Sequence, residues 1–232
     1  MHNGGSDSLS IANAARFAIS NWGVDANRVF AVGTSSGAMM TSVLAGAYPD
    51  VFKAGIVDSG VAFGCFAVPG QPDDSWNSQC SEGQLILTGA QWVYLSRDCQ
   101  CKVMVLTSVF NRLRRSRQPS PASLAHTRRC RSGTEPRTLT SPNLATPLGL
   151  ILHCSAPSDT TLFPQNFFEE IKQWTTVFGY PSSPISNITE AALPRGYSNS
   201  TFGPNFQAIL AQGVGHTVPL FEQQYLEFLG IA

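Results

Sequence analysis

Residues 33–37 read Gly-Thr-Ser-Ser-Gly, a pattern that can make a serine, here Ser35, into a nucleophile. In the G-x-S-x-G turn the serine lies between a strand and a helix, and side chains at the two glycine positions would collide with them. The pattern alone is weak evidence, because a chain with 20 glycines and 25 serines is expected to contain about 0.2 matches by chance. The surroundings strengthen it, since residues 29–32 form an apolar run typical of a buried strand and residues 38–48 predict a helix. We therefore predict that Ser35 is a nucleophile.

A serine nucleophile needs a base, and the usual base is histidine. His216 follows a glycine-rich loop between a predicted strand at residues 206–211 and a predicted helix at residues 220–229. The other three histidines have less suitable positions. His2 is at the terminus, His126 lies in an unpatterned basic stretch, and His153 ends an apolar strand. We predict that His216 is the base.

The acid that orients the imidazole should follow a strand and precede the histidine in the chain. Asp159 follows an apolar strand predicted at residues 148–153 by a short loop. Asp58 follows a second apolar strand, at residues 54–57, and is the alternative acid. With Asp159 the chain order is Ser, Asp, His, and the backbone N–H of Ser36 is the expected oxyanion donor. A second donor normally comes from a loop after an earlier strand, but no strand is predicted before the first helix.

Strands alternate with helices along the chain, which predicts an α/β fold with a parallel sheet. A first helix is expected from Ser6 or Asp7 to Trp22, and an amphipathic helix at residues 166–178. Residues 60–85 and 180–205 are expected to be loops.

Composition excludes several classes of protein. The chain has 232 residues, 15 basic and 15 acidic, with 43% apolar residues, which suits one domain and argues against a general nucleic-acid binder. No apolar run is long enough for a transmembrane helix. Six cysteines are too few for a disulfide scaffold. Most of the basic residues gather between Lys102 and Arg137, in a segment rich in Ser, Pro and Thr with little periodicity.

Six blocks of sequence resemble the secreted acetylxylan and feruloyl esterases of the polyhydroxybutyrate-depolymerase-like group, which are α/β-hydrolases. The resemblance covers about residues 2–92 and 148–232. Its blocks are residues 3–9, 33–41, 48–52, 159–166, 172–174 and 213–219.

The resemblance implies a three-layer α/β-hydrolase sandwich with a mostly parallel sheet, and a catalytic triad of Ser35, Asp159 and His216. Asp58 stands where the family usually has an uncharged residue. The resemblance also implies a disulfide between Cys65 and Cys80. It implies hydrolysis of carboxylic esters, most directly deacetylation of xylan, by an extracellular enzyme that needs no cofactor and is expected to be a monomer.

Two departures from the family accompany the resemblance. The family has a signal peptide, early strands and the loop that gives the second oxyanion donor upstream of the position of Met1, so we expect an N-terminally truncated chain. Residues 100–147 do not resemble the family, and we expect them to be an irregular or disordered basic insert. Residues 1–232 are then one partial catalytic domain.

Metal and nucleic-acid binding have little support in the sequence, whereas other substrates and an inactive fragment remain alternatives. The set Cys99, Cys101, Cys130 and His126 fits no common zinc spacing, so no metal is expected, and the arginines at 112–117 lack the aromatic residues of a nucleic-acid site. Asn187 and Asn199 begin glycosylation sequons. Feruloyl esters or polyesters are alternative substrates. A fragment that keeps the triad without activity, or a carbohydrate-binding relic, is the alternative of another class.

Overall fold

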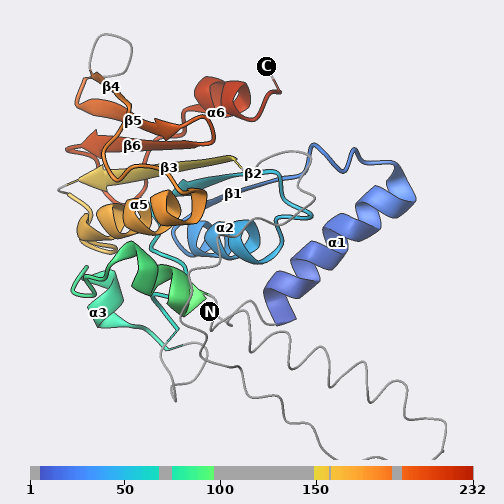
Figure 1. Ribbon diagram of the computed structural model, residues 1–232, viewed down its shortest axis with the longest axis horizontal. Coiled ribbons are helices and arrows are strands. Elements are labelled where there is room, and N and C mark those ends of the chain that lie inside the picture. Colours follow the sequence, from blue (N-terminus) through green and yellow to red (C-terminus); the bar gives the residue numbers. More distant parts are fainter. Residues whose placement is uncertain (1–5, 68–74, 97–148, 157, 190–194, 232) are drawn as a thin grey trace, which may run out of the picture.

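The structure is a computed structural model that describes residues 6–67, 75–96, 149–156, 158–189 and 195–231 (Figure 1). Its helices are α1 (Ser6–Trp22), α2 (Ser36–Ala47), α3 (Ser78–Ser81), α5 (Gln165–Phe178) and α6 (Glu222–Phe228). Residues 89–96 are also helical. Its strands are β1 (Phe30–Thr34), β2 (Ala54–Asp58), β3 (Gly149–Ala156), β4 (Ser186–Thr189), β5 (Tyr197–Gly203) and β6 (Phe206–Gln212).

The strands form one sheet in the order β1-β2-β3-β6-β5-β4. The neighbours β1, β2, β3 and β6 run parallel, and β5 and β4 continue the sheet in antiparallel pairs. The carboxyl ends of the parallel strands therefore meet at one edge, where loops after several strands can combine into one site.

Helices cover both faces of the sheet, as the α/β sandwich predicts (Figure 1). On one face, Ala38 and Ala45 of α2 and Trp174 of α5 pack with Val57 of β2. On the other face, Tyr225 of α6 packs in a cluster with Ile56, Tyr197 and Ile209. Ile56 and Val57 are neighbours in β2 and fully buried, so this strand is covered on both faces, which explains its continuous apolar sequence.

The sequence predicted α1, α2, α5, α6 and the parallel strands close to their observed positions, but it missed two short helices, α3 and residues 89–96, and two strands. Residues 180–205 were expected to be a loop, and they contain β4 and β5. These strands read Ser-Asn-Ile-Thr and Tyr-Ser-Asn-Ser-Thr-Phe-Gly, and all four residues of β4 are exposed. The pairing of β5 with β6 and of β4 with β5 supplies the order that their polar sequences do not indicate, since antiparallel strands can face water.

The stretch expected to be a loop at residues 60–85 is held by a disulfide between Cys65 and Cys80. Asn77 supports it, because its side chain accepts a hydrogen bond from the Cys80 N–H and donates one to the Cys65 carbonyl. Both cysteines are buried, in a cluster that includes Met39 of α2. The pair that the resemblance implied is therefore present.

Several expectations concern the chain outside the described residues. The basic insert at residues 100–147 lies there, with the candidate zinc ligands Cys99, Cys101, Cys130 and His126. Among the residues that are described, no helix is long and apolar enough to cross a membrane, and no group of three metal-ligating side chains occurs. Within the same part of the chain β1 forms one edge of the sheet, and its Val32 is 55% exposed.

Candidate active site

Three side chains from three strand ends form a chain of hydrogen bonds. The Ser35 Oγ lies 2.8 Å from His216 Nε2, and His216 Nδ1 lies 2.8 Å from Asp159 Oδ2. Ser35 follows β1, Asp159 follows β3 and His216 follows β6. The structure thus brings together the three residues that the sequence analysis selected, although they are 181 residues apart at the extremes.

The backbone of Ser35 is held in an uncommon conformation, with φ of 58° and ψ of −117°. Positive φ is costly for a residue with a side chain, and it persists where the surroundings fix it. Two backbone bonds do so, because the Ser35 N–H donates to the Asp58 carbonyl at 2.9 Å and the Ser35 carbonyl accepts from the Met39 N–H at 3.0 Å. Ser35 also occupies the N-cap of α2 without capping it with its side chain, so its hydroxyl is left to contact His216.

The two glycines of the turn have different roles. A Cβ at Gly33 would lie 2.3 Å from the carbonyl carbon and oxygen of Gly37, which no side chain can accommodate. A Cβ at Gly37 would meet nothing within 4 Å among the described residues. The expectation of a collision is therefore confirmed for Gly33 and wrong for Gly37. A side chain on Gly33 would point at the Gly37 backbone, whereas a side chain on Gly37 would point away from Gly33.

Backbone hydrogen bonds hold the Asp159 carboxylate in the orientation in which it contacts the imidazole. Its Oδ1 accepts hydrogen bonds from the backbone N–H groups of Thr161 and Leu162, at 2.8 and 2.9 Å, and the residue is buried. Its Oδ2 is left for His216. An ionised carboxylate only accepts, so the proton belongs on His216 Nδ1 and Nε2 can accept the hydroxyl proton of Ser35.

His216 must reach across the sheet to contact Ser35. Its strand, β6, is separated from β1 by β2 and β3, and strands lie about 4.8 Å apart. The loop after β6 begins with Gly213 at a φ of 76°, a conformation that glycine adopts without strain. The His216 side chain is 22% exposed, which leaves the imidazole accessible from solvent while Asp159 behind it is covered.

The alternative acid, Asp58, has a different partner. Its carboxylate Oδ1 accepts a hydrogen bond from the Tyr225 hydroxyl at 2.7 Å, and the residue is fully buried at the end of β2. Asp159, and not Asp58, accepts the hydrogen bond from His216. Of the other histidines, His153 lies in β3, and His2 and His126 lie outside the described residues.

Ser36, the predicted oxyanion donor, is the first residue of α2. The N–H groups of a first helical turn have no intrahelical acceptor and carry the positive end of the helix dipole. An anion that forms on a group bound at Ser35 would therefore be stabilised there. Among the described residues β1 is the first strand, and the second expected donor is not identified within them.

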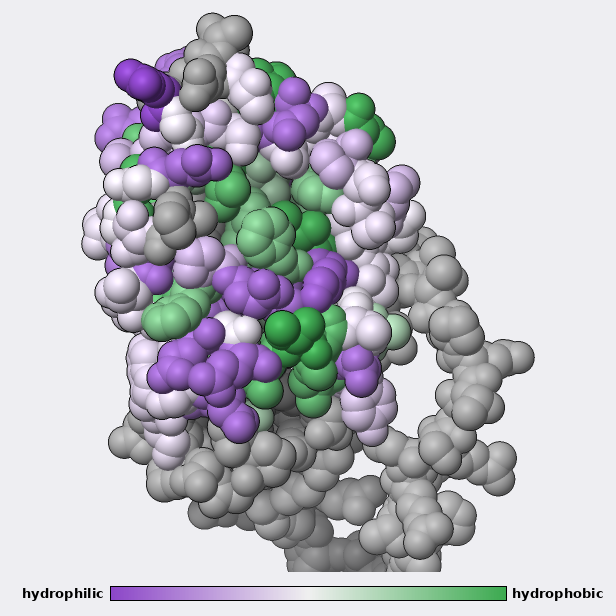
Figure 2. Space-filling view, turned by 90° about the vertical axis from the view of Figure 1, so that its left-hand side faces the viewer, coloured by the Kyte–Doolittle hydropathy of each residue, from purple (hydrophilic) through white to green (hydrophobic). Residues whose placement is uncertain are grey.

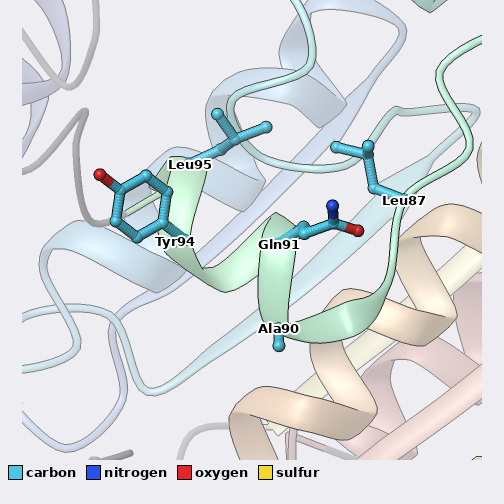
Figure 3. Close-up of a pocket in the computed structure, with 5 residues that line it drawn as sticks. All are labelled: Leu87, Ala90, Gln91, Tyr94 and Leu95. Carbon is cyan, nitrogen blue, oxygen red and sulfur yellow. The ribbon is translucent and has the colours of Figure 1, made fainter. Parts of the chain in front are cut away.

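The face of the molecule at the carboxyl ends of the parallel strands mixes hydrophobic and hydrophilic side chains in its middle (Figure 2). A hollow of about 510 Å³ lies on the helical segment 89–96, lined by Leu87, Ala90, Gln91, Tyr94 and Leu95 (Figure 3). It contains no nucleophile and no base. We therefore place the site at the hydrogen-bonded side chains rather than at this hollow.

Polar side chains on α5 attach the covering segments, and the sequence did not reveal them. Gln173 accepts from the Phe63 N–H at 2.8 Å and donates to the carbonyls of Phe63 and Trp92, at 3.0 and 3.3 Å. Glu169 accepts from the Leu87 N–H and the Trp92 indole N–H. The helical period showed only the apolar stripe of α5. Gln173 lies in residues 172–174, a block that carried the resemblance, but nothing in the sequence indicated what these buried polar residues contact.

Two neighbouring acids on α5 have opposite electrostatic surroundings. Burial favours the neutral form of Glu169, but hydrogen bonds from Lys172, Trp92, Gln165 and the Leu87 N–H together hold its pKa below the ordinary value. Burial raises the pKa of Glu170 well above the ordinary value. Its Oε1 is buried without a hydrogen-bond partner among the described residues. The hydrogen bonds therefore favour the ionised form of Glu169, whereas burial favours the neutral form of Glu170.

The parallel sheet, the serine turn after β1 and the chain order Ser, Asp, His define the α/β-hydrolase class of fold. In agreement, residues 1–63 match the model of the prolyl oligopeptidase family. The solved structure of an acetyl xylan esterase from Aspergillus awamori superimposes with a TM-score of 0.76 at 33% identity, covering 100% of this chain and 70% of that one. The chain belongs to the acetylxylan esterase family.

Curated relatives agree with this assignment. The acetylxylan esterase A of Aspergillus ficuum is 39% identical and that of Talaromyces purpureogenus 37%, each over 100% of this chain. The probable acetylxylan esterase A of Neosartorya fischeri is 38% identical, also over 100% of it. The chain spans 63%, 50% and 52% of the lengths of these three relatives, in that order.

The two glycines of the serine turn should respond differently to the addition of one methyl group. We expect Gly33→Ala to lower the free energy of unfolding by about 2 kcal/mol or more, because the methyl group overlaps backbone atoms that cannot move independently. Gly37→Ala should change it by less than about 1 kcal/mol, since the added Cβ meets open space. Urea unfolding of both variants measures the difference, and equal losses would contradict the geometry.

Proposed function

We propose that this chain is a serine carboxylic ester hydrolase that removes acetyl groups from xylan. The observation that carries the proposal is the pair of 2.8 Å contacts from Ser35 to His216 and from His216 to Asp159. The substrate class follows from the relatives, which are named acetylxylan esterases.

In the first half of the reaction Ser35 Oγ attacks the ester carbonyl carbon while His216 Nε2 takes the hydroxyl proton. The C–O bond to the sugar then breaks, and the imidazolium returns that proton to the leaving sugar oxygen. Asp159 stabilises the imidazolium without accepting its proton. The products of this half are a free sugar hydroxyl and an acetyl ester on Ser35.

In the second half a water molecule gives a proton to His216 Nε2 and attacks the acetyl carbonyl. The bond to Ser35 Oγ breaks, and Oγ recovers the proton from the imidazolium. Acetic acid leaves and ionises in solution. In both halves the carbonyl oxygen becomes an oxyanion, and the Ser36 N–H at the start of α2 is the donor that we assign to it.

We further propose that the protein acts outside the cell, as one catalytic domain and as a monomer. The Cys65–Cys80 disulfide supports an oxidising compartment. The single sheet shared by the described strands supports one domain. The partner is then the acetylated polysaccharide itself.

The first experiment is hydrolysis of 4-nitrophenyl acetate by the wild-type chain beside Ser35→Ala, with fluorophosphonate labelling mapped by mass spectrometry. We expect a label on Ser35 and a loss of about 10³-fold or more in kcat in the variant, because the nucleophile is gone. Acetate release from acetylated xylan, compared with feruloyl esters and a polyester, then tests the substrate. A folded wild-type chain with neither label nor turnover would refute the enzymatic proposal and favour an inactive fragment.

The two candidate acids can be separated by matched substitutions. Asp159→Asn should lower kcat by about 10³- to 10⁴-fold, because the amide favours the wrong imidazole tautomer and cannot stabilise the imidazolium. Asp58→Asn should lower it by less than about 10-fold, since it does not touch the imidazole in the structure. Steady-state kinetics decide the matter, and the opposite ranking would make Asp58 the acid.

The two sequons should differ in use if the protein is secreted. Asn187 is exposed on β4, whereas Asn199 Nδ2 donates to Gln207 Oε1 at 3.0 Å and its Oδ1 is buried. A glycan on Asn199 would have to break this contact. In protein secreted from yeast, an endoglycosidase-sensitive mass shift should disappear in Asn187→Gln and persist in Asn199→Gln. The reverse pattern would contradict the prediction.

A further inference from the structure

Asp58 lies between the strands that carry the parts of the candidate site. It is the last residue of β2, and in the register of the sheet it is paired with Thr34 of β1 and with His153 of β3. Thr34 is followed directly by Ser35. Asp58 is fully buried, and an acid in such a position is costly unless the structure supplies donors to it.

The backbone of Asp58 holds the nucleophile turn. Its carbonyl accepts the Ser35 N–H at 2.9 Å, and this bond fixes the residue whose φ of 58° would otherwise relax. Any shift of Asp58 therefore moves the start of the turn and with it Ser35 Oγ.

The side chain of Asp58 holds the segment that follows the base. Its Oδ1 accepts a hydrogen bond from the Tyr225 hydroxyl at 2.7 Å, and Tyr225 is 6% exposed. Tyr225 belongs to α6 and packs in the same cluster as Val218, two residues after His216. Burial, followed by the charge of Asp58, raises the pKa of Tyr225, so the hydroxyl stays protonated and remains a donor.

We propose that Asp58 and Tyr225 are positioning residues that set the distance between Ser35 and His216. One residue, Asp58, binds the turn of the nucleophile through its carbonyl and the helix after the base through its carboxylate. The inference rests on the proposed esterase function. It assigns a use to a buried acid that the chemical steps themselves do not need.

If Asp58 and Tyr225 position the reacting groups, breaking their hydrogen bond should lower turnover rather than substrate binding. Tyr225→Phe removes only the hydroxyl, and we expect about a 10-fold lower kcat with KM changed less than about 3-fold, since small displacements of reacting groups mainly affect the chemical step. The rate of fluorophosphonate labelling of Ser35 should fall by the same factor. Asp58→Asn keeps an acceptor oxygen for Tyr225 and should lose less, and the double variant should be no slower than Tyr225→Phe.

Tyr180→Phe is the matched control, because Tyr180 stacks on Phe178 in a different cluster and its variant loses the same atom. All variants are assayed well below their unfolding temperatures, so a loss of stability alone does not lower kcat. Wild-type kcat and labelling rate in folded Tyr225→Phe, or an equal loss in Tyr180→Phe, would overturn the positioning role alone. A wild-type chain that is itself inert would overturn the proposed function and this inference with it.

Discussion

The common orientation of four parallel strands is the constraint on which the candidate site depends. Because β1, β3 and β6 end at the same edge of the sheet, the residues after them meet although they are far apart in the chain. The pairings are continuous from β1 to β6, so a change of register in any of them would separate Ser35 from His216. The sheet is thus the frame for the chemistry, and the loops after the strands carry it.

The cost of this arrangement is visible in buried polar groups around the frame. Ser35 adopts positive φ, Asp58 is an acid with no exposed surface, and Glu169 and Gln173 are polar residues on the buried side of α5. Hydrogen bonds offset these costs for Glu169 and Gln173 and tie Phe63, Leu87 and Trp92 to α5. Buried polar residues that are costly individually therefore help to hold the covering segments on α5.

The strands and helices with a clear apolar pattern were predictable from the sequence. Apolar runs gave β1, β2 and β3, and the helical period gave α1 and α5. The polar strands β4 and β5 were not predictable from the sequence. Their order comes from the pairing of β5 with β6 and of β4 with β5, and not from burial of their own side chains.

By itself, the sequence determined which residue types can do the chemistry: a serine in a glycine-bounded turn, a histidine after a late strand and an aspartate between them. Local spacing and chain order carry that information. The resemblance already favoured Asp159 over Asp58, and the tertiary structure supplied the physical reason. Asp159, in the loop after β3, contacts the imidazole, whereas Asp58, the last residue of β2, contacts Tyr225. The tertiary structure also showed that a side chain is excluded at Gly33 and not at Gly37. The sequence cannot show this, because the two residues are of the same type and differ only in which backbone atoms lie beside them.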